Sequence, residues 1–141
     1  MELTLDQALK RGVDAHKAGN FQEADRYYTA ILKTNPKHAD ANHKMGVLAV
    51  NIGRLQQALP FFKMAVEADS STEQFWMSYI DALIKLNRVA NATVAFKQAR
   101  SNGAKGDSFV KLKKRLVSSE SENINVQDPP KEQLMSCLLY T

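Results

Sequence analysis

The sequence is poor in several residue types, and each shortage excludes a class of protein. The single cysteine, Cys137, cannot form an internal disulfide and favours a reducing compartment. Only 6 glycines and 4 prolines are present, so few residues interrupt helices. The longest apolar stretch, residues 47–50, is too short to span a bilayer, and residues 1–6 do not resemble a secretory signal. We therefore expect a cytoplasmic location and no membrane partner.

Charge and motif content exclude further functions. A net charge of +4 is modest, and the basic run at residues 111–115 has no aromatic side chains between its cations. We predict that this run is a solvated helix face rather than a phosphate-binding stripe or a targeting signal, and that nucleic acid is not a partner. The sequence has no Gly-rich phosphate loop, no His-Glu-x-x-His motif, no cysteine pair at metal-binding spacing and no nucleophile elbow. We expect no enzymatic activity, no metal and no cofactor.

What the sequence has instead is a period of 34 residues. When the chain is shifted by this interval, small residues fall on small residues and large apolar residues on large apolar ones. The positions that coincide include Ala24, Ala58 and Ala92, and likewise Tyr28, Phe62 and Phe96. A fixed period of this length indicates stacked structural repeats rather than a pocket enzyme.

Helical segments of roughly 14 residues fill each period. They are expected over residues 5–18, 21–34, 39–52, 55–68, 73–86 and 89–102. The short breaks between them, rich in Gly and Asn, force each helix to lie antiparallel to the one before. Gly12 and Gly46 offer notches that Tyr28 and Phe62 can fill. Pro60 removes one hydrogen bond near the start of its helix, where we expect an irregularity.

This pattern resembles the tetratricopeptide repeat, with units at residues 5–38, 39–72 and 73–106. The second unit matches best. The first departs from the pattern at Arg11, where an apolar residue is usual, and the third has Ile80 in place of a small residue. The resemblance implies an all-α fold, a right-handed α-solenoid of three antiparallel helix pairs.

The remaining sequence is expected to form three short segments. Residues 107–117 place Phe109, Leu112 and Leu116 on one face of a capping helix, which would close a domain spanning residues 1–117. The polar residues 118–130 are expected to form a flexible linker. Residues 131–141 return to an apolar helical pattern, which we interpret as the truncated start of a further repeat.

In tetratricopeptide proteins, the first helix of each pair lines a concave groove that holds a partner segment. The resemblance places in this groove Leu9, Lys10, Val13 and Lys17, then Asp40, His43, Lys44, Val47, Val50 and Asn51, and finally Gln74, Met77, Ser78, Asp81, Ile84 and Lys85. The apolar members suit the floor of a peptide-binding or helix-binding groove, unless they pack between neighbouring repeats. His16 and His43 are expected to face solvent or the groove, since a metal would have only Asp14 or Asp40 as further ligands.

The resemblance also allows one class of ligand to be tested. Family members that hold chaperone tails clamp a C-terminal carboxylate with two lysines, an arginine and two asparagines. The matching positions here are Leu9, Val13, Lys44, Gln74 and Ser78. Only Lys44 is basic and no asparagine is present, so heat-shock chaperone tails are not the predicted ligand.

Three functional hypotheses follow. The first is an interaction scaffold for a protein or peptide partner. The second is the N-terminal, substrate-recruiting arm of a larger glycosyl-, sulfo- or methyltransferase, because family members often place repeats before such domains and residues 131–141 look like the start of another repeat. The third is weak self-association through the C-terminal end.

Overall fold

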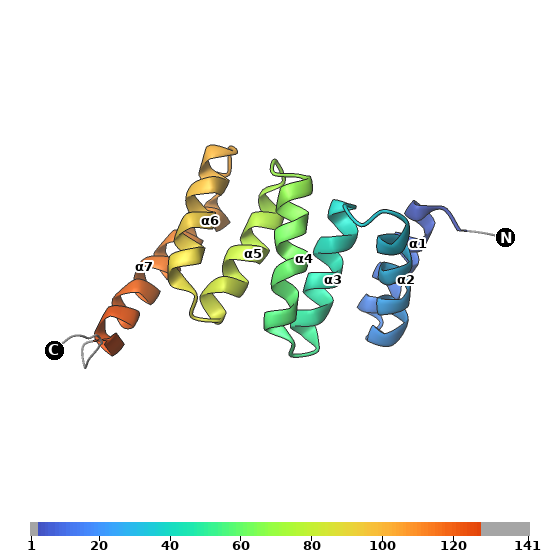
Figure 1. Ribbon diagram of the computed structural model, residues 1–141, viewed down its shortest axis with the longest axis horizontal. Coiled ribbons are helices and arrows are strands. Elements are labelled where there is room, and N and C mark those ends of the chain that lie inside the picture. Colours follow the sequence, from blue (N-terminus) through green and yellow to red (C-terminus); the bar gives the residue numbers. More distant parts are fainter. Residues whose placement is uncertain (1–2, 128–141) are drawn as a thin grey trace.

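The protein is described by a computed structural model that covers the backbone of residues 3–127 and the side chains of residues 3–118. Seven helices follow one another in chain order along the long axis of the molecule (Figure 1). They are α1 (Leu5–Lys17), α2 (Phe21–Thr34), α3 (Ala39–Asn51), α4 (Leu55–Ala68), α5 (Glu73–Lys85), α6 (Val89–Ser101) and α7 (Asp107–Gln127). All elements of the described part are helical, and α1 to α6 agree with the predicted segments to within one residue.

Local signals explain where the helices begin and end. Thr4 and Gln7 form a reciprocal capping box at the start of α1. Gly19 and Gly53 end α1 and α3 in the left-handed region, with φ of 83° and 82°. Asn87, which follows α5, takes the same conformation with φ of 60°. The expected irregularity at Pro60 is absent, since α4 runs unbroken from Leu55 to Ala68.

Glycine notches set the close approach within the first two helix pairs. A Cβ atom added at Gly12 would lie 2.6 Å from Cε1 of Tyr28, and one added at Gly46 would collide with the ring of Phe62. Both aromatic side chains are fully buried. The small residue and the aromatic ring therefore fit each other as the 34-residue period predicts. At ~25 cal/mol per Å² of buried apolar surface, the burial of each ring contributes a few kcal/mol to stability.

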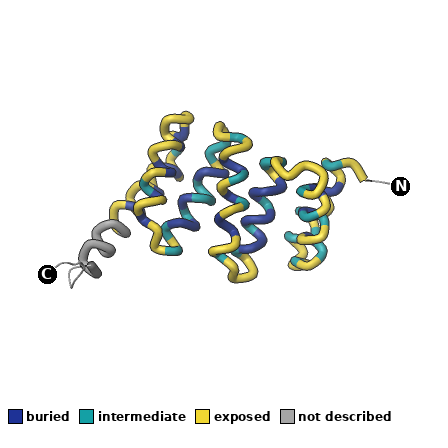
Figure 2. The backbone as a smooth tube through the Cα atoms, in the orientation of Figure 1, coloured by how far each residue is buried: buried dark blue, intermediate teal, exposed yellow. Residues whose placement is uncertain are grey.

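The helices form two layers. The first helices of successive pairs contact one another, α1 with α3, α3 with α5 and α5 with α7. Among the described residues, the second helices α2, α4 and α6 make no such contacts with each other. Because one layer is packed more closely than the other, the first helices form the inner side of the curved stack. Burial is concentrated in the middle of the row (Figure 2).

The C-terminal helix is longer than the sequence predicts. Phe109, Leu112 and Leu116 are buried as expected for a cap. However, α7 continues past residue 117 to Gln127, so the prediction of a flexible linker is wrong for residues 118–127. Their Ser, Glu and Asn residues tolerate helix, and no Pro or Gly interrupts the chain before Pro129. Residues 128–141, which include the predicted truncated repeat, lie outside the described part.

None of the helices described is long and apolar enough to cross a membrane. Within the same residues, no group of three His, Cys, Asp or Glu side chains is placed to hold a metal ion.

Candidate partner-binding surface

Polar side chains join each inner helix to the next. The bonded pairs are Asn51 Nδ2 with His16 Nε2 at 2.6 Å, His43 Nε2 with Ser78 Oγ at 2.7 Å, and Arg115 Nη1 with Asp81 Oδ1 at 2.6 Å. The partners in each pair are 34 or 35 residues apart in sequence. Side chains in equivalent or adjacent repeat positions of consecutive first helices are therefore neighbours on the inner surface.

The apolar residues predicted for the groove floor are half-buried. They are Val13, Val47, Val50, Met77 and Ile84. Val13 packs against a core cluster formed by α2 and α3, and the other four pack against the larger core that runs from α3 to α7. Each of these side chains thus contributes to packing between helices and also presents part of its surface to solvent.

The polar residues predicted for the groove divide between free and engaged side chains. Lys17 and Lys85 are exposed, and Lys44 is half-buried. Asn51 and Ser78 are held by the two histidines, and Asp81 pairs with Arg115 and with Nζ of Lys85 at 3.1 Å. Lys17 and Lys44, for which the described residues provide no ion pair, are therefore the polar side chains of this set with most freedom to meet a partner.

His43 is not the open side chain that the sequence predicts. It is 6% exposed, and its ring lies between Phe75 and Phe62, with centroid distances of 4.8 and 5.7 Å. Burial, and secondarily the charge of Lys44, lowers the pKa of His43 to about 4, against a small opposing effect of Asp40. A neutral, hydrogen-bonded His43 therefore ties α3 to α5.

His16 ties α1 to α3 in a more open setting. Its ring packs edge-on against Phe21, and its Nδ1 lies 3.4 Å from the hydroxyl of Tyr28. Burial, then the charge of Lys44, lowers the pKa of His16. The two histidines each engage a residue of the following repeat.

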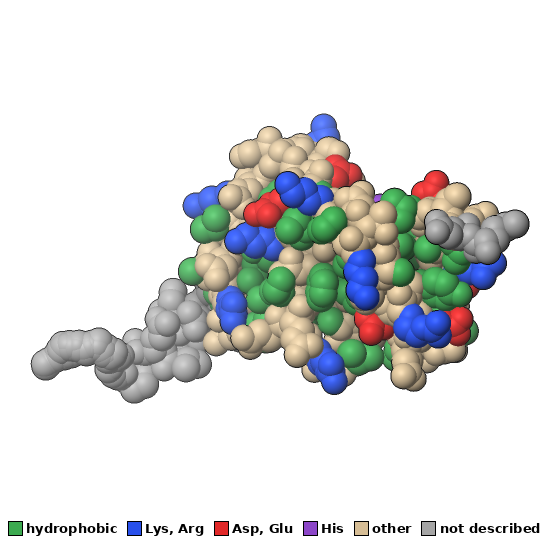
Figure 3. Space-filling model, turned by 45° about the vertical axis from the view of Figure 1, so that its right-hand side comes forward, with side chains coloured by type: hydrophobic (Ala, Val, Ile, Leu, Met, Phe, Trp, Pro, Cys, Tyr) green, Lys and Arg blue, Asp and Glu red, His purple; other side chains and the backbone are tan. Residues whose placement is uncertain are grey.

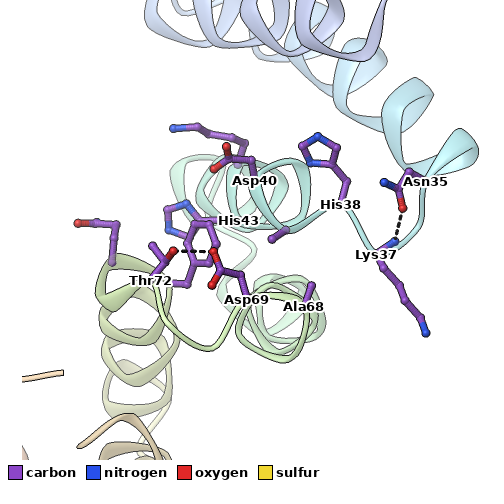
Figure 4. A pocket seen from close by; sticks show the side chains of 12 residues that line it. Asn35, Lys37, His38, Asp40, His43, Ala68, Asp69 and Thr72 are labelled. Atoms are coloured by element: carbon purple, nitrogen blue, oxygen red, sulfur yellow. Dashed lines mark hydrogen bonds between the residues drawn. The ribbon is translucent and has the colours of Figure 1, made fainter. Parts of the chain in front are cut away.

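A hollow of about 600 Å³ lies at one edge of the inner surface, between the turns that precede α3 and α5 (Figure 4). Its polar groups mostly serve these turns. The Nδ1 atom of His38 accepts a hydrogen bond from the amide of Ala41, and the Thr72 hydroxyl donates to Asp69 at 2.7 Å. These hydrogen bonds belong to the turns that lead into α3 and α5. The hollow is therefore the space between two helix starts and not a built ligand site.

A smaller hollow of about 260 Å³ lies between α5 and α7. It is lined by Gln74, Met77, Ser78, Asp81, Ser108, Lys111, Leu112 and Arg115. Lys111, Lys113, Lys114 and Arg115 are all exposed, as predicted for a solvated face, and Lys111 and Arg115 also line this hollow, whereas Lys113 and Lys114 do not. A usable signal was present, because Arg115 stands one period after Asp81 and so belongs beside it.

Exposed apolar side chains are otherwise dispersed over the described helices. Those of large size are Leu3, Ile52, Val94, Val110 and Val117. In the space-filling view of one face, hydrophobic side chains lie in separate groups between charged ones (Figure 3). A third hollow, of about 450 Å³, separates α2 from α4 in the outer layer and has Ile52 and Phe61 in its lining.

The architecture defines the class of protein, an all-α solenoid of antiparallel helix pairs. Residues 9–73 match the family model of the tetratricopeptide repeat. The chain thus contains tetratricopeptide repeats, and domains of this kind typically mediate protein–protein interaction. No curated protein sequence matches it.

Solved structures share this fold at low identity. The TPR2B domain of yeast Sti1, in complex with pHsp70, is 17% identical with a TM-score of 0.72, over 84% of this chain and 97% of that one. The Arabidopsis OM64 TPR domain is 20% identical with a TM-score of 0.70, over 81% and 94%. The Thermobaculum terrenum O-GlcNAc transferase is 18% identical with a TM-score of 0.62, over 73% of this chain and 21% of that one.

Proposed function

We propose that this protein is a non-enzymatic interaction scaffold that binds a peptide or helical segment of a protein partner along the inner surface of α1, α3 and α5. One observation carries the proposal. Half-buried apolar side chains, Val47 and Met77 among them, follow one another along the inner helices, with Lys17, Lys44 and Lys85 beside them. An apolar strip with a charged border suits a segment with one apolar face.

The test uses the intact chain and a display library of random short peptides. Selected peptides are synthesised, and their affinity is measured for the wild type and for the double variant Val47→Glu/Met77→Glu. We expect binding to be lost, because two carboxylates would be placed in the apolar strip. Since both residues are half-buried, circular dichroism must show that the variant keeps its helicity.

The control is Ile52→Glu, which introduces one such carboxylate beside the hollow of the outer layer. This variant should bind the selected peptides as the wild type does. Loss of binding in Ile52→Glu with retention in the double variant would move the site to the outer layer and disprove the groove assignment.

A second candidate is the recruiting arm of a larger transferase. It is supported by the likeness to part of the O-GlcNAc transferase, which at 18% identity concerns the fold. Sequencing the gene past codon 141 and blotting the native protein separate the two candidates, because an arm requires a reading frame that continues into a catalytic domain. The cytoplasmic location and self-association through the C-terminal end stay predictions.

A further inference from the structure

The basic run of α7 is split between two sides of the helix. Lys111 and Arg115 are four residues apart, so they share one face, and both line the hollow against α5. Lys113 and Lys114 are exposed and do not line it. The capping helix therefore adds cations to the C-terminal end of the inner surface, beyond the third repeat.

The charges in and beside this hollow do not balance. Asp81 is its one carboxylate, and it is shared between Lys85 at 3.1 Å and Arg115 at 2.6 Å. Lys111 has no ion-pair partner among the described residues. Among the lining residues, two cations, Lys111 and Arg115, thus face one anion, Asp81. The Asp81 contact also fixes the guanidinium of Arg115, which keeps further N–H donors for another acceptor.

The rest of the lining suits an amino-acid side chain of a partner. Gln74, Ser78 and Ser108 bring polar groups, whereas Met77 and Leu112 supply apolar contact. At about 260 Å³ the hollow is below the common size of small-molecule sites, roughly 300–1,000 Å³. It is open at the end of the same inner surface to which Met77 belongs, so a segment lying on that surface can reach it.

We propose that this hollow is an acidic-side-chain subsite, in which Lys111 and Arg115 bind an Asp or Glu of the partner segment while Met77 and Leu112 contact an apolar residue next to it. The inference rests on the proposed function and specifies its ligand as a segment that combines acidic and apolar residues. Charge complementarity carries it, since a carboxylate would neutralise the excess positive charge and accept charge-assisted hydrogen bonds.

The experiment repeats the random-peptide selection on three forms of the full chain, the wild type, Lys111→Glu and Lys113→Glu. The two variants change the net charge equally on the same helix, but only residue 111 lines the hollow. Peptides selected by the wild type should be enriched in Asp and Glu. Their affinity should fall at least about tenfold in Lys111→Glu, because one charge-assisted contact is lost and a like charge is introduced, and it should stay within about twofold in Lys113→Glu.

A charge-reversal readout strengthens the test. Selection on Lys111→Glu should replace the acidic residue of the enriched peptides by Lys or Arg, and a merely structural role of Lys111 would not produce this exchange. Equal effects of the two variants, or selected peptides without acidic residues, would overturn the subsite.

The subsite and the groove can fail separately. If the selected peptides lose affinity in Val47→Glu/Met77→Glu but not in Lys111→Glu, the groove stands and the acidic subsite is wrong. If the wild-type chain selects no peptide at all, both proposals are wrong.

Discussion

The first two repeats and the third use different residues at the equivalent position where the two helices of a pair pack together. In the second repeat, Gly46 leaves a notch that the ring of Phe62 fills. In the third, Ile80 is fully buried at the equivalent position, and Phe96 stacks on Phe109 of α7 with ring centroids 4.3 Å apart. The α5 and α6 helices are also less closely packed than α3 and α4. In the third repeat, the ring of Phe96 thus finds its packing partner in the capping helix, whereas in the second repeat the ring of Phe62 packs into a notch of its own helix pair.

This difference gives α7 two roles. Its apolar face completes the core of the third repeat, and its basic face borders the inner surface. Glu73 at the start of α5 fixes its position, because Oε1 accepts hydrogen bonds from the amides of Lys105 and Gly106 at 3.0 and 3.1 Å. The helix that ends the repeats is therefore an integral part of the fold and of the candidate site.

The largest expected effect concerns Ile80. Ile80→Ala leaves a cavity between α5 and α6 beside the stacked Phe96 and Phe109, and it should lower the free energy of unfolding by about 2–5 kcal/mol. Urea denaturation followed by circular dichroism measures this. The control is Val94→Ala on the exposed side of α6, which should change stability by less than about 0.5 kcal/mol. Equal losses in the two variants would contradict the central place given to Ile80.

A smaller effect should distinguish the His43–Ser78 contact from the His16–Asn51 contact, through the dependence of the free energy of unfolding on pH. His43 has a folded pKa of about 4 against an ordinary value of 6.5, so the folded state binds fewer protons than the unfolded state between these values. Its contribution is fully present above pH 6.5 and is lost as the pH falls toward about 4, a decrease of roughly 2–3 kcal/mol. Denaturation at a series of pH values should show this slope.

The matched variants are His43→Asn and His16→Asn. His43→Asn should flatten the dependence on pH in this window, because the buried titrating group is gone. His16→Asn should flatten it less, since His16 is the more exposed of the two and spans the α1–α3 contact. The reverse order of the two effects would show that the first inter-repeat contact, not the second, is the one sensitive to acid.

Most of the fold follows from local signals in the sequence. The helix bounds are fixed by Gly19, Gly53 and Asn87 at helix ends, together with the 34-residue period. The notch at Gly46 follows from residue size alone. The end of α7 does not, because Ser, Glu and Asn residues are compatible with both a linker and a helix, and composition cannot decide between them.

The candidate surface could be predicted in outline from the repeat register, but its engaged side chains could not. The burial of His43 depends on Phe75 from the next repeat closing over its ring. The division of the basic run depends on how α7 is rotated against α5, which places Arg115 on Asp81 and leaves Lys113 in solvent. The burial of His43 depends on packing between helices, for which the pattern within one helix carries no signal, whereas the 34-residue interval between Asp81 and Arg115 was a usable signal for their pairing.

The smallest effect tests the notch of the second repeat. In a helix, Gly→Ala ordinarily stabilises by about 1 kcal/mol, yet at Gly46 the added methyl group collides with the ring of Phe62. Overpacking of this kind costs about 1–3 kcal/mol, so after the propensity gain is subtracted we expect Gly46→Ala to lower the free energy of unfolding by up to about 2 kcal/mol. Adding Phe62→Leu makes room for the methyl group, so the double variant should be more stable than the sum of the single effects predicts. Stabilisation by Gly46→Ala alone would mean that the ring can move aside, and the second repeat would then tolerate a larger residue at this position, as the third does with Ile80.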